Sequence, residues 1–154
     1  MQNELSTSAD EYNYLRTEEL LPSFTWNDET GKSFSSESLK GKPSLIILFT
    51  KDCRHCTDNF AYLEKNLFSK NFNSLRIIAF GRDCNHQQVE SYRMNYNLSI
   101  KLIADPERNI YSKFAEKVVP RIYFFDSESR LKLSVRGFRT YELDEIILRC
   151  LMNK

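Results

Sequence analysis

An unbroken apolar run followed closely by two cysteines most constrains what this chain can fold into. Residues 44–49 read SLIILF, and Cys53 and Cys56 follow within seven residues. A continuous apolar run of this length is typical of a strand buried on both faces. Beyond Cys53, apolar residues recur at helical spacing at Phe60, Leu63 and Leu67. The pattern predicts a buried strand, a short loop and then a helix that begins near the cysteines.

Strand and helix patterns alternate along the rest of the chain. Strands are expected at residues 23–26, 32–34, 44–49, 75–80, 100–104, 121–125 and 131–135. Helical stretches are expected at 35–40, beyond 53, at 85–97, from Asp105 and Pro106 onward, and in a terminal helix with apolar residues between 143 and 151. The alternation predicts an α/β fold with a central mixed sheet flanked by helices, parallel in its centre and antiparallel at its closing hairpin.

Length and charge limit the broad class of protein. We expect one domain at residues 21–154, preceded by a polar, loosely held extension at 1–20 that covers a sheet edge. The 22 basic and 21 acidic residues nearly cancel, which argues against binding nucleic acid or a membrane surface through net charge. No stretch approaches the roughly 20 apolar residues of a membrane span. The first twenty residues lack the apolar run of a signal peptide. The compartment therefore stays open: cytoplasm, or periplasm or cell envelope if an export signal was trimmed.

The position of the two cysteines predicts redox chemistry. A helix N-terminus offers unpaired N–H groups and the positive end of the helix dipole, and both favour a thiolate over a thiol. The thiolate is the species that attacks in disulfide exchange. We therefore expect Cys53 to be the nucleophile and Cys56, one helical turn later, to resolve the mixed disulfide.

Charged neighbours are expected to tune this pair. Arg54 and His55 lie between the cysteines and would lower the pKa of Cys53, since a nearby cation favours the charged thiolate. A more stable thiolate makes the pair more oxidising. We expect Asp52 to cap the helix, with a charge that partly opposes Arg54.

Other uses of the cysteines stay as alternatives. Haem attachment needs a His directly after the second cysteine, and Thr57 stands there. A zinc site formed by Cys53, Cys56, Cys84 and His86 is an alternative, although C-x-H is tighter than usual ligand spacing. An inert pair in a binding module without turnover is the non-enzymatic alternative.

Together with VVP before the strand RIYFF, these features resemble the thioredoxin superfamily, most closely its TlpA-like and AhpC/TSA-like branch. The resemblance rests on the front hairpin, on GKPSLIILF and on an inserted βα unit at residues 75–97. It implies a thioredoxin-like fold, a cis peptide between Val119 and Pro120, and a free Val119 backbone that pairs with an extended substrate. It also implies exchange with protein thiols or disulfides, a recycling redox partner, and no cofactor beyond the dithiol.

The chain departs from that family pattern at three positions. Asp52 replaces the usual aromatic residue before the first cysteine, and Ile47 stands where thioredoxins carry a buried Asp. Asn59 stands where many TlpA-like proteins have Glu. The proton of Cys56 must still have an acceptor, and His55, Asp58 or water are the candidates.

A peroxiredoxin-like thiol peroxidase that uses Cys53 is the runner-up enzyme. Thr50 and Cys53 fit half of the peroxidase motif, but Ile46 stands where that motif has Pro. Arg121 is the candidate for the arginine at the peroxide site, although it directly follows Pro120.

The remaining cysteines are assigned from their neighbours. Cys84 follows strand 75–80 at the sheet edge where Cys53 also lies, which makes it a possible third redox thiol. A loop cysteine without a partner is the simpler interpretation. Cys150 lies on the apolar stripe of the last helix and is expected in the core.

Overall fold

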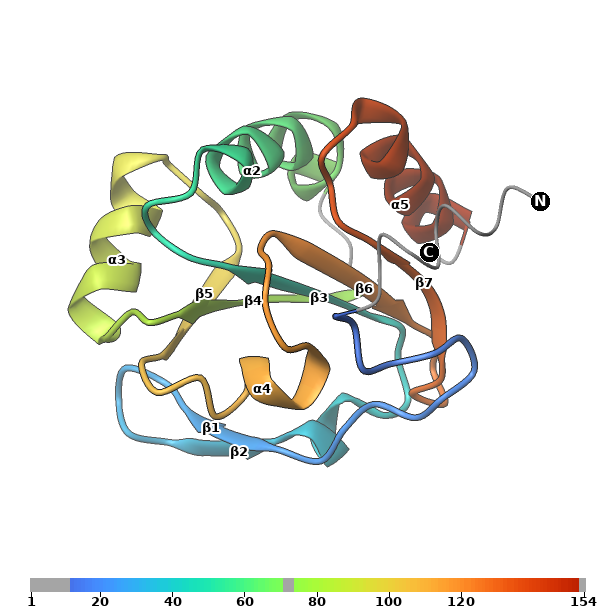
Figure 1. Ribbon diagram of the computed structural model, residues 1–154, viewed down its shortest axis with the longest axis horizontal. Coiled ribbons are helices and arrows are strands. Elements are labelled where there is room, and N and C mark those ends of the chain that lie inside the picture. The colour runs from blue at the N-terminus through green and yellow to red at the C-terminus, as the bar shows by residue number, and fades with distance from the viewer. Residues whose placement is uncertain (1–11, 71–73, 153–154) are drawn as a thin grey trace.

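The computed structural model of the protein describes residues 12–70 and 74–152. A five-stranded mixed sheet has the order β5-β4-β3-β6-β7, and a separate two-stranded hairpin pairs β1 with β2 (Figure 1). The strands are β1 (Thr25–Asn27), β2 (Ser33–Ser35), β3 (Ser44–Phe49), β4 (Arg76–Arg82), β5 (Lys101–Asp105), β6 (Arg121–Phe125) and β7 (Leu131–Val135). The helices are α2 (Arg54–Asn66), α3 (His86–Asn95), α4 (Tyr111–Phe114) and α5 (Thr140–Met152), with short 3-10 helices at Ser36–Leu39 and Phe68–Lys70.

The pairing of β3 explains why its sequence is apolar throughout. It runs parallel to β4, with Ile46 opposite Ile78, and antiparallel to β6, with Ile46 opposite Tyr123. All six of its residues are buried. A strand with neighbours on both edges and protein on both faces needs no polar position. The prediction of a mixed sheet, parallel in the centre and antiparallel at the closing hairpin, is confirmed.

The two faces of the sheet carry separate hydrophobic cores. Leu45, Ile47 and Phe49 point into the core that lies under α2, α3 and α5. Ile46 and Leu48 point into the opposite core, which is closed by α4 and the β1-β2 hairpin. Figure 1 shows the same layers, with the three longer helices on one side of the sheet. The alternation follows from the period of two along a strand.

Residues 12–20 are hydrogen-bonded to the body of the protein. The N–H of Glu18 donates to the carbonyl of Leu131, and the N–H of Leu131 donates back to Glu19. The buried side chain of Asn13 accepts a hydrogen bond from the Tyr123 hydroxyl at 2.8 Å. This part of the segment is therefore not loosely held; residues 1–11 of the predicted extension lie outside the described residues.

The helix expected from Asp105 onward begins later and is much shorter. Asp105 is the last residue of β5, and a turn follows it before α4 starts at Tyr111. The Asp105 carboxylate accepts from the N–H groups of Ile110 (3.0 Å) and Tyr111 (2.7 Å). It therefore stabilises the start of α4 from a distance rather than opening a helix at its own position. No helix among the described residues is long and apolar enough to cross a membrane.

Candidate active site

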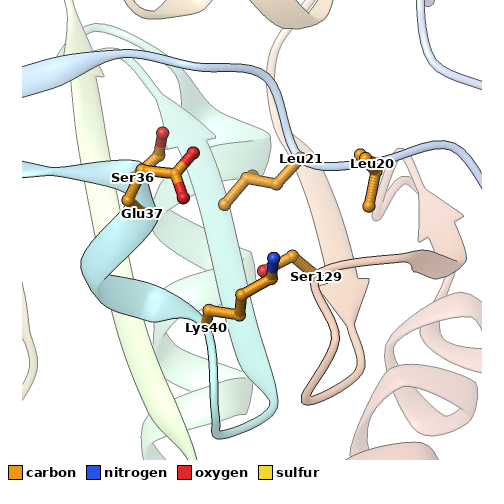
Figure 2. Close-up of a pocket in the computed structure, with 6 residues that line it drawn as sticks. All are labelled: Leu20, Leu21, Ser36, Glu37, Lys40 and Ser129. Atoms are coloured by element: carbon orange, nitrogen blue, oxygen red, sulfur yellow. The ribbon is translucent and has the colours of Figure 1, made fainter.

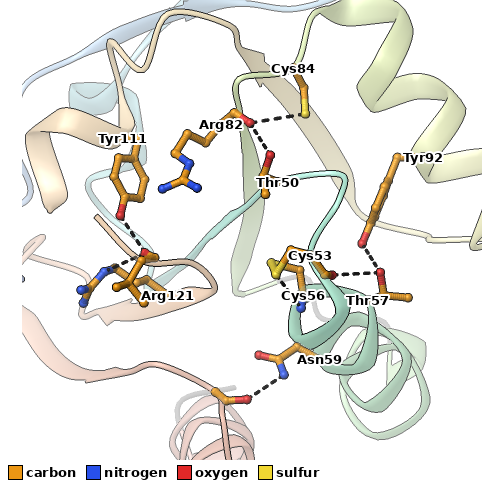
Figure 3. The surroundings of a disulfide bond; sticks show 12 residues. Thr50, Cys53, Cys56, Thr57, Asn59, Arg82, Cys84, Tyr92, Tyr111 and Arg121 are labelled. Carbon is orange, nitrogen blue, oxygen red and sulfur yellow. Dashed lines mark hydrogen bonds between the residues drawn. A yellow bond between two sulfur atoms is a disulfide. The ribbon is translucent and has the colours of Figure 1, made fainter. Parts of the chain in front are cut away.

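Four segments that are far apart in the sequence meet at one edge of the sheet. The disulfide loop follows the C-terminal end of β3, and Cys84 follows that of β4. Because β6 runs antiparallel to β3, its N-terminal end brings Pro120 to the same edge. The loop after β7 arrives there as well, and Gly137 contacts Asn59 of α2. Figure 3 shows this surrounding of the disulfide. The common edge predicted for Cys53 and Cys84 is thus present, and Pro120 lies at this edge as well.

Cys53 and Cys56 form a disulfide across the first turn of α2, with their Cα atoms 5.2 Å apart. Cys53 is itself the N-cap residue, and its Sγ accepts a hydrogen bond from the N–H of Cys56 at 3.1 Å. The expectation that Asp52 caps the helix is therefore wrong. The Asp52 carboxylate turns to solvent and pairs with Lys51 at 3.0 Å instead.

The two sulfur-bearing residues differ in exposure. Cys53 is half-buried, while Cys56 is only 1% exposed and belongs to the core under α2. An incoming thiolate therefore reaches the sulfur of Cys53 more easily than that of Cys56. This asymmetry matches the predicted order of an attacking and a resolving cysteine.

The peptide bond between Val119 and Pro120 is cis, as the resemblance implied. Pro120 is buried, and the half-buried Val119 contacts both hydrophobic cores. Within the described chain, no hydrogen bond engages the backbone N–H or C=O of Val119. An unpaired backbone segment beside a disulfide is suited to pairing with an extended peptide.

Arg54 and His55 are both exposed at the start of α2. The His55 ring lies against Phe138, with the ring centroids 5.0 Å apart, and the Arg136 guanidinium lies 4.4 Å from the centroid of Phe138. Sequence reasoning missed Phe138. The only signal for it is an exposed aromatic residue after a predicted strand, which by itself does not indicate a site.

Asn59 lies one helical turn beyond Cys56 and is 4% exposed. Its Nδ2 donates to the carbonyl of Gly137 at 2.8 Å, while its Oδ1 has no hydrogen-bond partner among the described residues. Gly137 has φ +74°, and a Cβ at this position would lie 2.1 Å from Asn59 Oδ1. Asn59 is therefore a neutral amide that joins α2 to the loop before α5.

A short polar chain supports the disulfide loop and was not predicted. The Thr57 hydroxyl donates to the Cys53 carbonyl at 3.3 Å and lies 3.0 Å from the Tyr92 hydroxyl of α3. Thr50 donates from its hydroxyl to the Arg82 carbonyl at 2.7 Å, which joins the loop to β4. Burial raises the pKa of Tyr92, so this hydroxyl stays protonated at neutral pH.

Cys84 is fully buried, and its Sγ–H donates to the Arg82 carbonyl at 3.5 Å. Burial raises the pKa of this thiol, which lowers the fraction of reactive thiolate. His86 lies in a different hollow, beside Glu29 and Arg93. The described residues contain no group of three or more His, Cys, Asp and Glu side chains that would hold a metal. The four ligands of the zinc alternative are therefore not assembled.

Arg121 does not support the peroxidase alternative. Its side chain is 2% exposed, and its guanidinium donates to the backbone carbonyls of Lys117 (2.9 Å) and Val118 (3.1 Å). A guanidinium that serves a peroxide has to direct its donors toward the reacting sulfur. Here these donors are engaged by the loop before Pro120.

Besides the hollow at His86, the described residues line a groove and a small pocket away from the disulfide. A groove of about 420 Å3 beside Lys51 runs along α3 and is lined by polar side chains and two tyrosines: Gln87, Gln88, Ser91, Tyr92, Asn95 and Tyr96. A pocket of about 50 Å3 is lined by Leu20, Leu21, Ser36, Glu37, Lys40 and Ser129, and Figure 2 shows these side chains. Since Lys40 precedes β3 and Cys53 follows it, this second pocket lies at the other end of the sheet.

The sheet, the cis proline and the disulfide at the start of α2 define a thioredoxin-like fold. Residues 17–134 match the AhpC/TSA family. The chain belongs to the AhpC/TSA family.

Individual relatives are distant in sequence and similar in fold. The thiol–disulfide oxidoreductase ResA of Bacillus subtilis is 20% identical over 119 residues, which cover 77% of this chain and 66%, just under two thirds, of that protein. A candidate protein disulfide isomerase from Bacteroides thetaiotaomicron has a TM-score of 0.85 at 21% identity, with 92% of each chain covered. The thioredoxin domain of a thiol–disulfide oxidoreductase from Bacteroides vulgatus has a TM-score of 0.73 at 18% identity, covering 88% of this chain and 98% of that one.

Proposed function

We propose that this protein exchanges disulfides with protein substrates through Cys53 and Cys56. The observation that carries the proposal is the disulfide between a half-buried Cys53 and a buried Cys56 at the N-terminus of α2, beside the cis Val119–Pro120 bond. The protein needs no cofactor beyond its own dithiol, and a second redox protein restores its starting state.

The exchange proceeds in two sulfur transfers. A substrate thiolate attacks Cys53 Sγ, breaks the bond to Cys56 and forms a mixed disulfide, while the Cys56 thiolate takes up a proton. A second substrate thiolate then attacks the substrate sulfur of the mixed disulfide and releases the Cys53 thiolate. The substrate loses two electrons to become a disulfide, and the protein gains them as a dithiol. The reverse sequence reduces a substrate disulfide.

The start of α2 stabilises the Cys53 thiolate that this exchange requires. The N–H of Cys56 already points at Cys53 Sγ, and a thiolate accepts such a bond more strongly than a disulfide sulfur does. Arg54 adds positive charge within the same turn, and His55 is the other residue there that can carry a positive charge. We expect Arg54→Ala and His55→Ala to lower the reduction potential measured against glutathione, and an unchanged potential in both variants would remove this role for them.

The backbone of Val119 is the proposed contact for an extended substrate segment. Its free N–H and C=O lie at the sheet edge where Cys53 also lies, so a substrate strand that pairs with them brings its own cysteine toward Cys53. Because main-chain hydrogen bonds are largely independent of sequence, this contact favours proteins as a class.

Capture of the mixed disulfide tests the proposal directly. In Cys56→Ser the resolving sulfur is missing, so the Cys53 thiolate that attacks a disulfide of insulin should remain bonded to one insulin sulfur, while the other insulin sulfur leaves as a thiol. Cys53→Ser is the matched control, since it keeps Cys56 but removes the accessible sulfur. Mass spectrometry identifies the bonded cysteine. Equal capture by both variants, or by neither, contradicts the proposed roles.

The same variants distinguish the remaining alternatives. A peroxidase would consume hydrogen peroxide with a thiol donor, and Cys53→Ser would abolish this consumption. A bond from Cys53 to Cys84 in Cys56→Ser would establish Cys84 as a third redox thiol. The absence of that species would leave Cys84 as a buried structural thiol.

A further inference from the structure

We propose that Arg121 and Tyr111 are positioning residues, which fix the loop before Pro120 so that the Val119 backbone is held ready for substrate. This inference rests on the proposed function, because it assigns a role in recognition of the protein substrate. The two side chains come from different elements, β6 and α4, and converge on the same loop (Figure 3).

Both side chains donate to the backbone of that loop. The Tyr111 hydroxyl donates to the Val118 carbonyl at 2.7 Å. Arg121 Nε donates to the same carbonyl at 3.1 Å, and its Nη2 donates to the Lys117 carbonyl at 2.9 Å. Three donors therefore fix two successive carbonyls directly before Val119.

The loop needs such support because its backbone is unfavourable. Val118 has φ +84°, a region that a β-branched residue rarely adopts. Such conformations persist only where the surroundings hold them in place, and they cluster at functional sites. The bonds from Arg121 and Tyr111 end on the carbonyl of this same residue.

The choice of Arg121 is unusual for a packing position. It is 2% exposed and lies in β6, opposite Leu48 of the central strand. A guanidinium is rarely buried so fully unless its donors are satisfied, and a planar fork reaches two carbonyls at once. Tyr111 is equally buried, and the Arg82 guanidinium lies 4.9 Å from the centroid of its ring. We call Arg121 and Tyr111, with their hydrogen bonds to the carbonyls of Lys117 and Val118, the clamp. Packing around both side chains holds the clamp in place.

The first test removes one hydroxyl from the clamp. Tyr111→Phe keeps the buried ring and loses only the bond to Val118. Tyr123→Phe is the matched control, because it removes a buried hydroxyl that bonds to Asn13, on another element. Each variant is assayed with insulin as a protein disulfide and with 5,5′-dithiobis(2-nitrobenzoic acid) as a small disulfide that has no backbone to pair with Val119.

We expect Tyr111→Phe to raise the apparent KM for insulin about fivefold, the equivalent of one neutral hydrogen bond. Its rate with the small disulfide should stay within twofold of the wild-type rate. Its reduction potential should be unchanged. Tyr123→Phe should leave the insulin KM unchanged. Equal behaviour of the two variants on insulin, or an equal loss on both disulfides, would overturn the clamp.

The second test examines the shared carbonyl. Arg121→Lys keeps the positive charge but loses the fork, and it should raise the insulin KM at least as much as Tyr111→Phe does. Because both side chains act on Val118, the double variant should lose less than the product of the two single effects. Strict multiplication of the effects contradicts a common target. If the wild-type protein does not exchange with insulin, both the proposed function and the clamp fail. If the wild-type protein does exchange with insulin and the variants have the same KM, only the clamp fails.

Discussion

The contact between Gly137 and Asn59 gives a sharp test of how the loop before α5 is held against the active-site helix. In Gly137→Ala the new Cβ would lie 2.1 Å from Asn59 Oδ1, far inside contact distance. The substitution also places a side chain at φ +74°, a left-handed conformation. Both effects act on the folded state, so the free energy of unfolding should fall.

The magnitude has two parts. The left-handed backbone costs an alanine about 1 kcal/mol. Displacing Asn59 breaks its hydrogen bond to the Gly137 carbonyl within a buried site, which costs about 2 kcal/mol more. The sum is about 3 kcal/mol, and at this chain length it corresponds to a fall in Tm of roughly 6–12 °C.

Gly31→Ala is the matched control for the backbone part. Gly31 has φ +88°, but a Cβ there would meet nothing within 4 Å. Urea unfolding of the oxidised proteins, followed by circular dichroism, should therefore give a loss of about 1 kcal/mol for Gly31→Ala and about 3 kcal/mol for Gly137→Ala. Equal losses would refute the reasoning. In an Asn59→Ala background the extra penalty at Gly137 should disappear, since the clashing amide is gone.

Three further predictions concern a helix start and the two free cysteines. Asn85→Ala removes the cap of α3 and should lower the free energy of unfolding by about 1 kcal/mol, whereas Asn95→Ala in the same helix is a near-neutral control. Burial raises the pKa of Cys150 to about 12, so the folded state keeps a proton that the unfolded thiol loses near pH 9. The stability of wild type relative to Cys150→Ala should hence fall as pH rises from about 9 to 12, by up to about 1.4 kcal/mol per pH unit; a constant difference contradicts this. Cys84 should resist alkylation at pH 8 in the native protein and react fully in urea, because it is buried and its pKa is raised.

The central sheet was predictable because its signal is local. The apolar run at residues 44–49 became β3 with the same bounds, and the hairpin strands at 121–125 and 131–135 also agree. Each of these segments is buried or bonded along its length, so composition and pairing point to the same structure. The position of the disulfide at the start of α2 followed from the same reasoning.

Errors occurred where a distant contact decides the local structure. The helix expected to open at Asp105 starts only at Tyr111, because the Asp105 carboxylate caps amide groups five and six residues away. The helix expected at 85–97 ends at Asn95, and Tyr96 just beyond its end is 48% exposed. Element ends are set by capping and by tertiary contacts, which periodicity does not report.

Most of the side chains around the disulfide could not be placed from the sequence. The sequence suggested for Arg121 only the role of a peroxidase arginine. Its hydrogen bond to the Lys117 carbonyl could not be predicted, because that bond depends on the turn at Val118. Thr57 and Tyr92 are 35 residues apart and carry no motif. Their contact exists because α2 and α3 pack on the same face of the sheet.

The unequal exposure of the two sulfur-bearing residues limits where another molecule can react with this protein. Cys56 is enclosed by the core, so Cys53 is the residue of the pair that a reacting molecule can approach. Under the proposed exchange, a substrate protein and the redox protein that restores the starting state would both have to react at Cys53. The two could therefore not be bonded to this protein at the same time, and the proposed exchange would alternate between them.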